Sequence, residues 1–177
     1  NPTKDLYEAF VAMEGENGYR LNSSIRTAAQ LENLGISLQA GTNLVGHEGY
    51  FMWKNRALKE DCVYDASYFQ ALQYINLRVM RYAEVLLNYA EAACGAGEMG
   101  VAVEQLKKIR ARVGYTSANN FGLQTNLSGD QAACFAAILY ERQIELAYEG
   151  KRFDDLRRWM LFDGGTAVVP KTVPTGC

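Results

Sequence analysis

The sequence predicts an all-α fold of helical hairpins with a loop-rich, irregular N-terminal segment, and three observations support this prediction. Residues 81–92 (RYAEVLLNYAEA) place apolar side chains at helical spacing around most of a helix. A glycine-rich turn at residues 95–100 is followed by a second amphipathic stretch at residues 101–113. Glycines interrupt residues 1–77 repeatedly, which is typical of turns rather than of long helices.

The helix predicted at residues 81–92 is too apolar to stand at a surface, so we expect neighbouring helices to cover most of it. Small residues on one flank allow another helix to approach closely. The principal buried face is expected to contain Val79, Tyr82, Leu86, Tyr89 and Ala93, widened by Ala83, Leu87, Ala90 and Cys94. In the second helix, Arg110 and Arg112 are expected on the outside. The two helices together resemble a tetratricopeptide-like (TPR-like) unit.

Two further helices are predicted downstream. A helix capped by Ser128 or Asp130 is expected to run to Glu149, where a glycine ends it. A fourth helix is expected from about residue 151 to 162. The sequence thus predicts a single domain with three parts. These are a loop-rich variable segment (1–77), helical hairpins (78–163) and a coil tail (164–177). Within the first part, residues 5–13 are expected to form a short helix.

Length and charge narrow the range of functions. The 177 residues are enough for one domain with a hydrophobic core. A net charge of −2 gives no electrostatic basis for binding nucleic acid, and no apolar run is long enough to span a bilayer. Because the chain starts with Asn1 rather than Met, we expect a mature or trimmed fragment whose localisation signal is missing.

The cysteines and the histidine indicate no metal or catalytic site. Cys62, Cys94, Cys134 and Cys177 are widely spaced without a Cys-x-x-Cys pair, which disfavours zinc. Cys94 and Cys134 fall in predicted helices and are expected to be buried thiols, while a disulfide in any of three pairings stays open. Nothing near His47 completes a catalytic set. No cofactor is predicted, and whether a calcium ion contributes is left open.

A charged stripe runs along the third predicted helix between two apolar flanks, so we expect it to be partly buried. Buried charges need partners. Residues 141–158 carry five acids and five bases, which favours a structural ion network. We expect its members to pair with one another at the junction of the hairpins: Arg81, Glu141, Arg142, Glu145, Arg152 and Asp155. Removal of one member, such as Arg152, is expected to destabilise the fold by about 3–5 kcal/mol.

An enzymatic alternative uses the same helix. Glu141 and Glu145 could serve as the acid and base of a glycoside hydrolase, which needs two carboxylates at a controlled separation. Carboxylates four residues apart, beside an equal number of basic residues, are more typical of a structural network. We therefore expect no enzymatic activity.

Three blocks resemble the RagB/SusD family in content and order: RYAEVLLNYAEA at residues 81–92, IRARVG at 109–114 and ERQIELAYEGKRFDDLRRW at 141–159. A weaker match, NPTKDL, occupies residues 1–6. The resemblance implies a surface-exposed lipoprotein of the Gram-negative outer membrane that binds glycans and sits on a SusC-type TonB-dependent transporter. It also implies a SusD-like α-superhelix of which this chain is a carboxy-terminal portion, touching the membrane only through a lipid anchor that is missing here.

The matching blocks are scaffold, so the ligand site is predicted from side-chain chemistry. Residues 50–74 hold seven aromatic residues, which either cover the helical core or stack on sugar rings. In the second interpretation, the ligand site is formed by Tyr50, Trp53 and Tyr64, with Asn55 and Arg56 as polar partners. The sequence thus predicts a non-enzymatic protein that delivers an oligosaccharide or another nutrient to the transporter. The alternative is a TPR-like protein-interaction scaffold without sugar binding.

Overall fold

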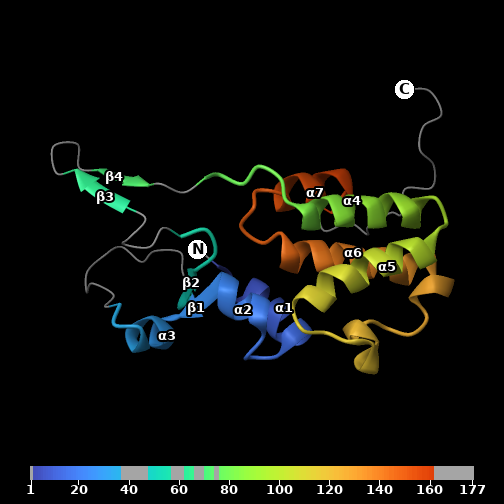
Figure 1. Ribbon diagram of the computed structural model, residues 1–177, viewed down its shortest axis with the longest axis horizontal. Coiled ribbons are helices and arrows are strands. Elements are labelled where there is room, and N and C mark those ends of the chain that lie inside the picture. Colours follow the sequence, from blue (N-terminus) through green and yellow to red (C-terminus); the bar gives the residue numbers. More distant parts are fainter. Residues whose placement is uncertain (1, 37–47, 57–61, 66–69, 74–75, 162–177) are drawn as a thin grey trace. The chain divides into compact units, whose positions relative to one another are not determined.

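The computed structural model of the chain describes residues 2–36, 48–56, 62–65, 70–73 and 76–161 (Figure 1). These residues are mostly helical, which confirms the predicted all-α class. Strands occur as two short antiparallel pairs, both before residue 80. The chain divides into two compact units, Asn1–Val79 and Met80–Cys177. The predicted coil tail lies outside the described residues.

The first unit contains short elements joined by turns. Its helices are α1 (Lys4–Glu14), α2 (Tyr19–Ser24) and α3 (Ala28–Asn33). Its strands are β1 (Ile25–Thr27), β2 (Tyr50–Met52), β3 (Cys62–Asp65) and β4 (Gln70–Gln73). Strand β1 pairs with β2, and β3 pairs with β4. The helix predicted at residues 5–13 is confirmed as α1, whereas α2, α3 and the strands were not predicted.

Local capping explains where these helices start and end. The Thr3 hydroxyl accepts a hydrogen bond from the Leu6 amide at 3.3 Å and caps α1. Thr27 and Gln30 form a reciprocal capping box at the start of α3. Gly15 ends α1 with a φ of +76°, a conformation that favours glycine.

Gly18 lies between α1 and α2 in the chain, and its backbone leaves no room for a side chain. It precedes α2 and lies against Glu14, whose carboxylate accepts a hydrogen bond from the Arg20 amide at 2.8 Å and pairs with the Arg20 side chain. A Cβ atom at Gly18 would overlap the Glu14 side chain. A small side chain at residue 18 would therefore disturb a buried ion pair.

We expect Gly18→Ala to destabilise the protein by about 1–3 kcal/mol, because the new methyl group forces Glu14 and Arg20 to shift. Thermal unfolding followed by circular dichroism measures the change. Gly100→Ala is the control, since a Cβ at that helical position meets nothing within 4 Å. The control should be neutral or slightly stabilising, because alanine favours a helix over glycine. Equal melting points for the two variants would show that the contact at Gly18 is not tight.

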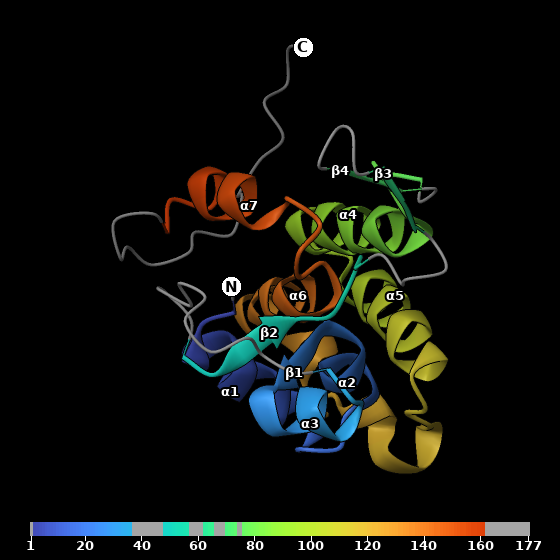
Figure 2. The same cartoon turned by 90° about the vertical axis from the view of Figure 1, so that its left-hand side faces the viewer.

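The second unit is built on a helical hairpin. Helix α4 (Tyr82–Gly95) and helix α5 (Met99–Arg112) are joined by a tight turn, and α6 (Gln131–Glu145) packs against both (Figures 1 and 2). Two short 3₁₀ segments, η2 (Ser117–Gly122) and η3 (Leu127–Gly129), connect α5 to α6, and α7 (Arg152–Arg158) follows. None of the helices in the described ranges has the length and hydropathy that a membrane span requires.

The predicted boundaries of the last two helices need correction. Asp130 is the cap of α6, because its carboxylate accepts a hydrogen bond from the Ala133 amide at 3.0 Å. The helix ends at Glu145 rather than Glu149, and Tyr148 takes a positive φ of 63° in the turn that follows. Helix α7 is correspondingly shorter than the predicted 151–162.

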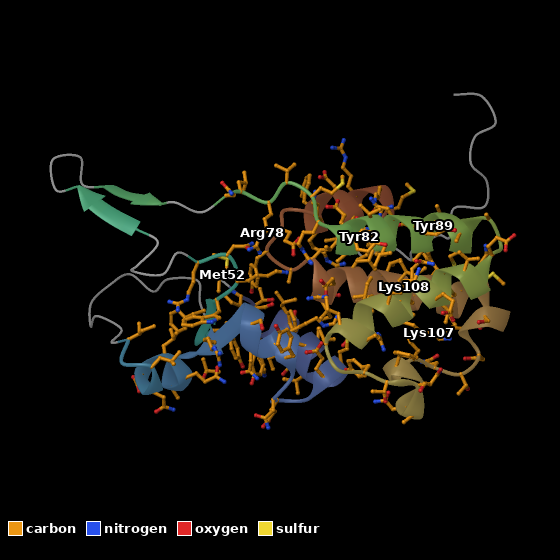
Figure 3. The ribbon with its side chains drawn as sticks, in the orientation of Figure 1. Met52, Arg78, Tyr82, Tyr89, Lys107 and Lys108 are labelled. Atoms are coloured by element: carbon orange, nitrogen blue, oxygen red, sulfur yellow. The ribbon has the colours of Figure 1, made fainter. Side chains whose placement is uncertain are left out.

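The buried face of α4 also differs from the prediction. Tyr82 and Tyr89 are 72% and 54% exposed, and both stand on the outer side of the helix (Figure 3). The flank of small residues faces the core instead, because Ala90 lets α5 and α6 approach the α4 backbone. Fully buried members of the core include Leu87, Ala90, Cys94, Ala102, Leu106, Cys134 and Ile138. Cys94 and Cys134 are thus buried thiols, as predicted.

Candidate functional site

The predicted ligand residues of the first unit start at strand β2. Tyr50 lies opposite Thr27 of β1, and its ring stacks on the ring of Tyr7 with the centroids 4.4 Å apart. The strand continues into Trp53, whose amide donates to the Ser24 carbonyl at 2.8 Å. The Trp53 backbone is therefore held at the end of the β1–β2 pair. One face of the Tyr50 ring is covered by Tyr7.

Trp53 is flanked by two guanidinium groups. The Arg56 guanidinium carbon lies 3.3 Å from the ring centroid and that of Arg26 lies 5.3 Å away. Such contacts are attractive because the ring face is electron-rich. Arg26 also donates from Nη1 to Asn22 at 3.1 Å, and its buried Nε has no acceptor among the described residues. Trp53 is therefore stacked with Arg56, and Arg26 lies nearby.

The remaining predicted ligand residues are placed only in part. Asn55 is exposed and takes a positive φ of 61° in the turn between Trp53 and Arg56. Tyr64 lies in β3 opposite Ala71, but its side chain lies outside the described structure. Three aromatic residues of the same segment are also outside it: Tyr68, Phe69 and Tyr74. The structure thus brings Tyr50, Trp53, Asn55 and Arg56 together on one strand and turn.

The charged residues of the second unit form a buried network, which begins with Arg142. Its Nε and Nη2 atoms donate to the two carboxylate oxygens of Asp155, each at 2.9 Å, and Nη1 donates to Asn88 at 2.7 Å. Both charged side chains are about 95% buried, with exposures of 4% and 5%. A bidentate pair of this kind ties α6 to α7, and its third donor reaches α4.

Arg81 makes the second set of contacts, at the start of α4. It donates to both oxygens of Glu149 at 2.7 Å, to the Glu145 carboxylate at 2.9 Å and to the Glu145 carbonyl at 2.8 Å. Burial lowers the pKa of Arg81, but the hydrogen bonds to these two carboxylates outweigh it, and the net pKa is raised. Arg81 therefore stays charged and anchors α4 to the end of α6.

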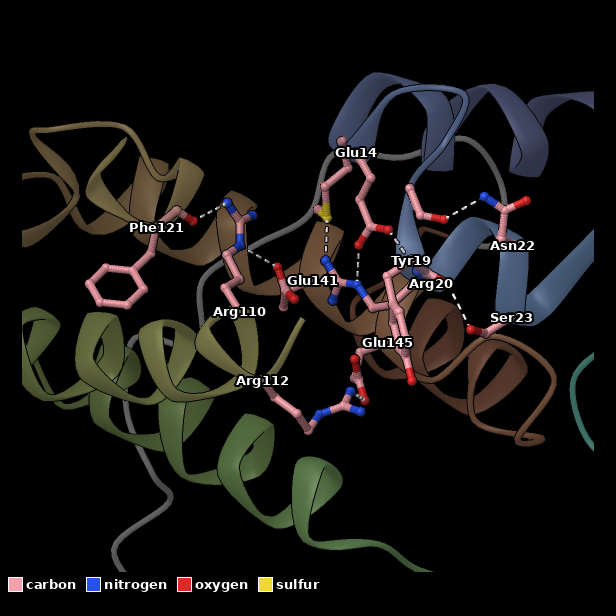
Figure 4. A network of polar contacts seen from close by, with 12 residues as sticks. Glu14, Tyr19, Arg20, Asn22, Ser23, Arg110, Arg112, Phe121, Glu141 and Glu145 are labelled. Carbon is pink, nitrogen blue, oxygen red and sulfur yellow. Dashed lines mark hydrogen bonds and ion pairs between the residues drawn. The ribbon is translucent and has the colours of Figure 1, made fainter. Parts of the chain in front are cut away.

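Glu141 pairs with Arg110, a residue that the sequence placed on the outside of α5. Arg110 Nε donates to the Glu141 carboxylate at 2.7 Å, and Nη1 donates to the carbonyls of Gly122 and Phe121 at 2.7 and 3.2 Å (Figure 4). Glu141 is fully buried and Arg110 is 5% exposed. The prediction was wrong for Arg110 because its guanidinium turns inward to reach a carboxylate and the η2 turn.

Arg152 does not join the network as expected. It is the first residue of α7, its side chain is exposed, and it donates to the Gln143 amide oxygen at 3.3 Å. Asp155 is already held by Arg142 and by Arg158. Arg152 makes no ion pair in the described part of the chain. Its removal is therefore expected to destabilise the fold only slightly, not by the large amount that the sequence predicted.

Sequence reasoning also missed Glu91 of α4. Its carboxylate accepts a hydrogen bond from the buried Trp159 indole at 2.9 Å and from Arg158 Nη2 at 2.6 Å. The signal was present in the sequence, since Glu91 directly follows Ala90, a small residue of the α4 crossing. A charged residue beside a packing face indicates a partner on the facing helix.

The ion pairs of Glu141 and Glu145 argue against the glycoside hydrolase alternative. The Glu141 side chain has no exposed surface, and Arg110 occupies its carboxylate. Glu145 is 2% exposed and contacts both Arg81 and Arg112. Both carboxylates therefore act as partners of arginine in the core, and neither is presented to a substrate. Among the described residues no group of three or more histidine, cysteine or acidic side chains is placed to hold a metal ion.

Comparison with known proteins identifies the family. A family model described as the SusD family matches residues 5–171. The chain belongs to the SusD family. It is also similar to "SusD-like protein P2" of Formosa agariphila, with 41% identity over 86 residues. That match covers 46% of this chain and 16% of the relative. No solved structure matches the chain.

The SusD family match includes both units. It takes in the strand and turn that carry Tyr50 and Trp53, and also the buried ion network. Because the network joins all the main helices of the second unit, it is scaffold of this SusD-type fold.

Proposed function

We propose that the protein is a non-enzymatic glycan-binding protein of the cell surface, which delivers oligosaccharide to a SusC-type TonB-dependent transporter. The observation that carries this proposal is the SusD family match over residues 5–171. The resemblance to that family also supports an outer-membrane location through a lipid anchor. The buried, arginine-paired carboxylates of α6 support the non-enzymatic role.

The proposed ligand site is the strand and turn from Tyr50 to Arg56, with Tyr64 from the neighbouring aromatic segment. Trp53 and Tyr50 supply aromatic surface, which sugar rings contact through their apolar faces. The Arg56 guanidinium carries N–H donors of the kind that bind ring hydroxyls. Stacking on Trp53 holds the Arg56 guanidinium in place, which reduces the ordering needed on binding.

Replacement of Trp53 tests this site. We expect Trp53→Ala to weaken oligosaccharide binding at least tenfold, about 1.4 kcal/mol, because it removes the aromatic surface and the support of Arg56. Isothermal titration calorimetry against the cognate oligosaccharide measures the change. Tyr19→Ala is the control, since Tyr19 is a 64% exposed aromatic residue of the same unit.

Circular dichroism melting of both variants checks that they stay folded. Arg56→Gln provides a second, less disruptive variant and should also weaken binding. Unchanged affinity in Trp53→Ala and Arg56→Gln would exclude this strand and turn as the sugar site.

A protein-interaction scaffold without sugar binding is the second candidate, and one observation favours it. Tyr82, Val85 and Tyr89 are exposed at helical spacing along α4. Figure 3 shows the two tyrosines on this helix. Exposed apolar surface of this kind is typical of a protein contact. A pure scaffold would show no heat of binding with any oligosaccharide, whereas the proposed function requires such heat.

A further inference from the structure

Two buried thiols lie in the same hydrophobic cluster, one on α4 and one on α6. Cys94 lies in the last turn of α4 and Cys134 in the first turn of α6, and neither has any exposed surface. The two helices pack directly together, as the two perpendicular views show (Figures 1 and 2).

Hydrogen bonds hold these two helix ends in register. Gln131 precedes Cys134 by one turn, and its side-chain amide donates to the Cys94 carbonyl at 2.7 Å. The Cys94 thiol lies 3.5 Å from the Gln131 carbonyl oxygen. These two contacts between Cys94 and Gln131 keep the end of α4 close to the start of α6, where Cys134 lies.

We propose that Cys94 and Cys134 form a disulfide bond that joins α4 to α6 in the mature protein. The bond requires the sulfurs to approach to about 2.05 Å. The Cys94 sulfur already lies against the backbone of Gln131, one turn before Cys134 on the packed helix α6, so only a small movement is needed. The inference rests on the proposed surface location for its oxidising environment, since disulfides persist outside the cytosol.

The bond forms by exchange with a disulfide oxidant, either a small molecule or a protein. The thiolate of one cysteine attacks the oxidant and releases one thiol, which leaves a mixed disulfide on the chain. The second cysteine then displaces the other half of the oxidant. The two cysteines lose two electrons and two protons in total, and the oxidant leaves as two thiols.

Burial determines when this exchange takes place. Burial raises the pKa of the Cys94 thiol to about 12, and the neighbouring Cys134 adds to the increase. Burial also raises the pKa of Cys134, although its hydrogen bond with Cys94 opposes the rise. The thiolate that exchange requires is therefore scarce in the folded state. The bond forms while the helices are still assembling, and oxidation of folded, reduced protein is slow.

Peptide mapping tests the pairing. The full chain is exported to a bacterial periplasm, denatured, alkylated without reduction and digested with trypsin. The expected product links peptide 82–107, which holds Cys94, to peptide 113–142, which holds Cys134. Free, alkylated Cys94 and Cys134, or a link from either to Cys62 or Cys177, would overturn the proposal. Because this result does not depend on sugar binding, it is separate from the outcome for the proposed function.

Thermal unfolding gives a second, independent readout. Protein folded with oxidised glutathione should melt about 10 °C above protein folded in reductant, because the bond restricts the unfolded chain. The difference should disappear in C94A/C134A and persist in Cys62→Ala, the matched control. Equal melting points for the oxidised and reduced wild-type protein would contradict a bond between these helices.

Discussion

Arg142→Ala is expected to lower the free energy of unfolding by about 3–5 kcal/mol. Asp155 would lose its bidentate partner while staying 5% exposed, and Asn88 would lose its donor. The remaining contact of Asp155 with Arg158 is partly exposed and is expected to be weak. For a chain of this size, the loss corresponds to a fall in melting temperature of about 10 °C.

Arg152→Ala is the matched control for this experiment. Both residues are arginines of the charged segment after residue 140, but Arg152 is exposed, donates a hydrogen bond to Gln143 and makes no ion pair among the described residues. We expect a change within about 0.5 kcal/mol, as for most exposed positions. Denaturant titration measures both variants. Similar losses for the two would show that Arg152 has a buried partner and that the arrangement described for α7 is wrong.

Arg110→Ala is expected to have an effect of similar size, about 3–5 kcal/mol. Glu141 is fully buried, so removal of Arg110 would leave an unpaired carboxylate in the core. The substitution also removes donors from the carbonyls of Phe121 and Gly122, which hold the η2 turn against α5. Urea unfolding at neutral pH would measure the loss.

Arg112 provides the control for Arg110, two residues further along α5. Its side chain is 51% exposed, and its partner Glu145 keeps Arg81 when Arg112 is removed. We expect Arg112→Ala to cost less than about 1 kcal/mol, since exposed ion pairs contribute little. If Arg112→Ala destabilised as strongly as Arg110→Ala, burial would not be the property that decides which pairs matter.

Periodicity was sufficient to predict the four α-helices of the second unit, but not which side of each helix is buried. The wheel of α4 placed Tyr82 and Tyr89 on the same broad apolar face as Leu86 and Ala93. Only half of that face is covered, because close helix crossings select the small residues Ala83 and Ala90 instead of the large aromatic ones. A sequence pattern cannot tell which of two adjoining apolar faces is buried unless the neighbouring helices are known.

The charged network shows a similar limit. The sequence indicated that Glu141 and Arg142 need partners, since apolar residues flank them. It could not identify Arg110, because an arginine on an amphipathic helix has the same pattern whether its guanidinium meets solvent or a carboxylate. Arg152 was included in the predicted network because it is near Asp155 in the sequence. In the structure the ion-pair partner of Asp155 on α6 is Arg142 instead.

The candidate ligand site depends on a long-range pairing that spacing does not reveal. Trp53 contacts Arg56 locally, but Arg26 reaches it only because β1 and β2 pair across a long connection. The sequence predicted a ligand site in this segment from its aromatic and polar residues, and that site stays a prediction. The sequence could not predict that arginines would flank the Trp53 ring, since that requires the register of two strands.

Calorimetric screening of the whole chain against a panel of oligosaccharides tests the proposed function most directly. A glycan-binding protein of the SusD family should give saturable heat with at least one member of the panel. The affinity should be unchanged in Arg152→Ala and at least tenfold weaker in Trp53→Ala, and binding should come without release of reducing sugar. Absence of heat with every oligosaccharide, or release of reducing sugar that is lost in Glu141→Gln, would contradict a non-enzymatic glycan-binding function.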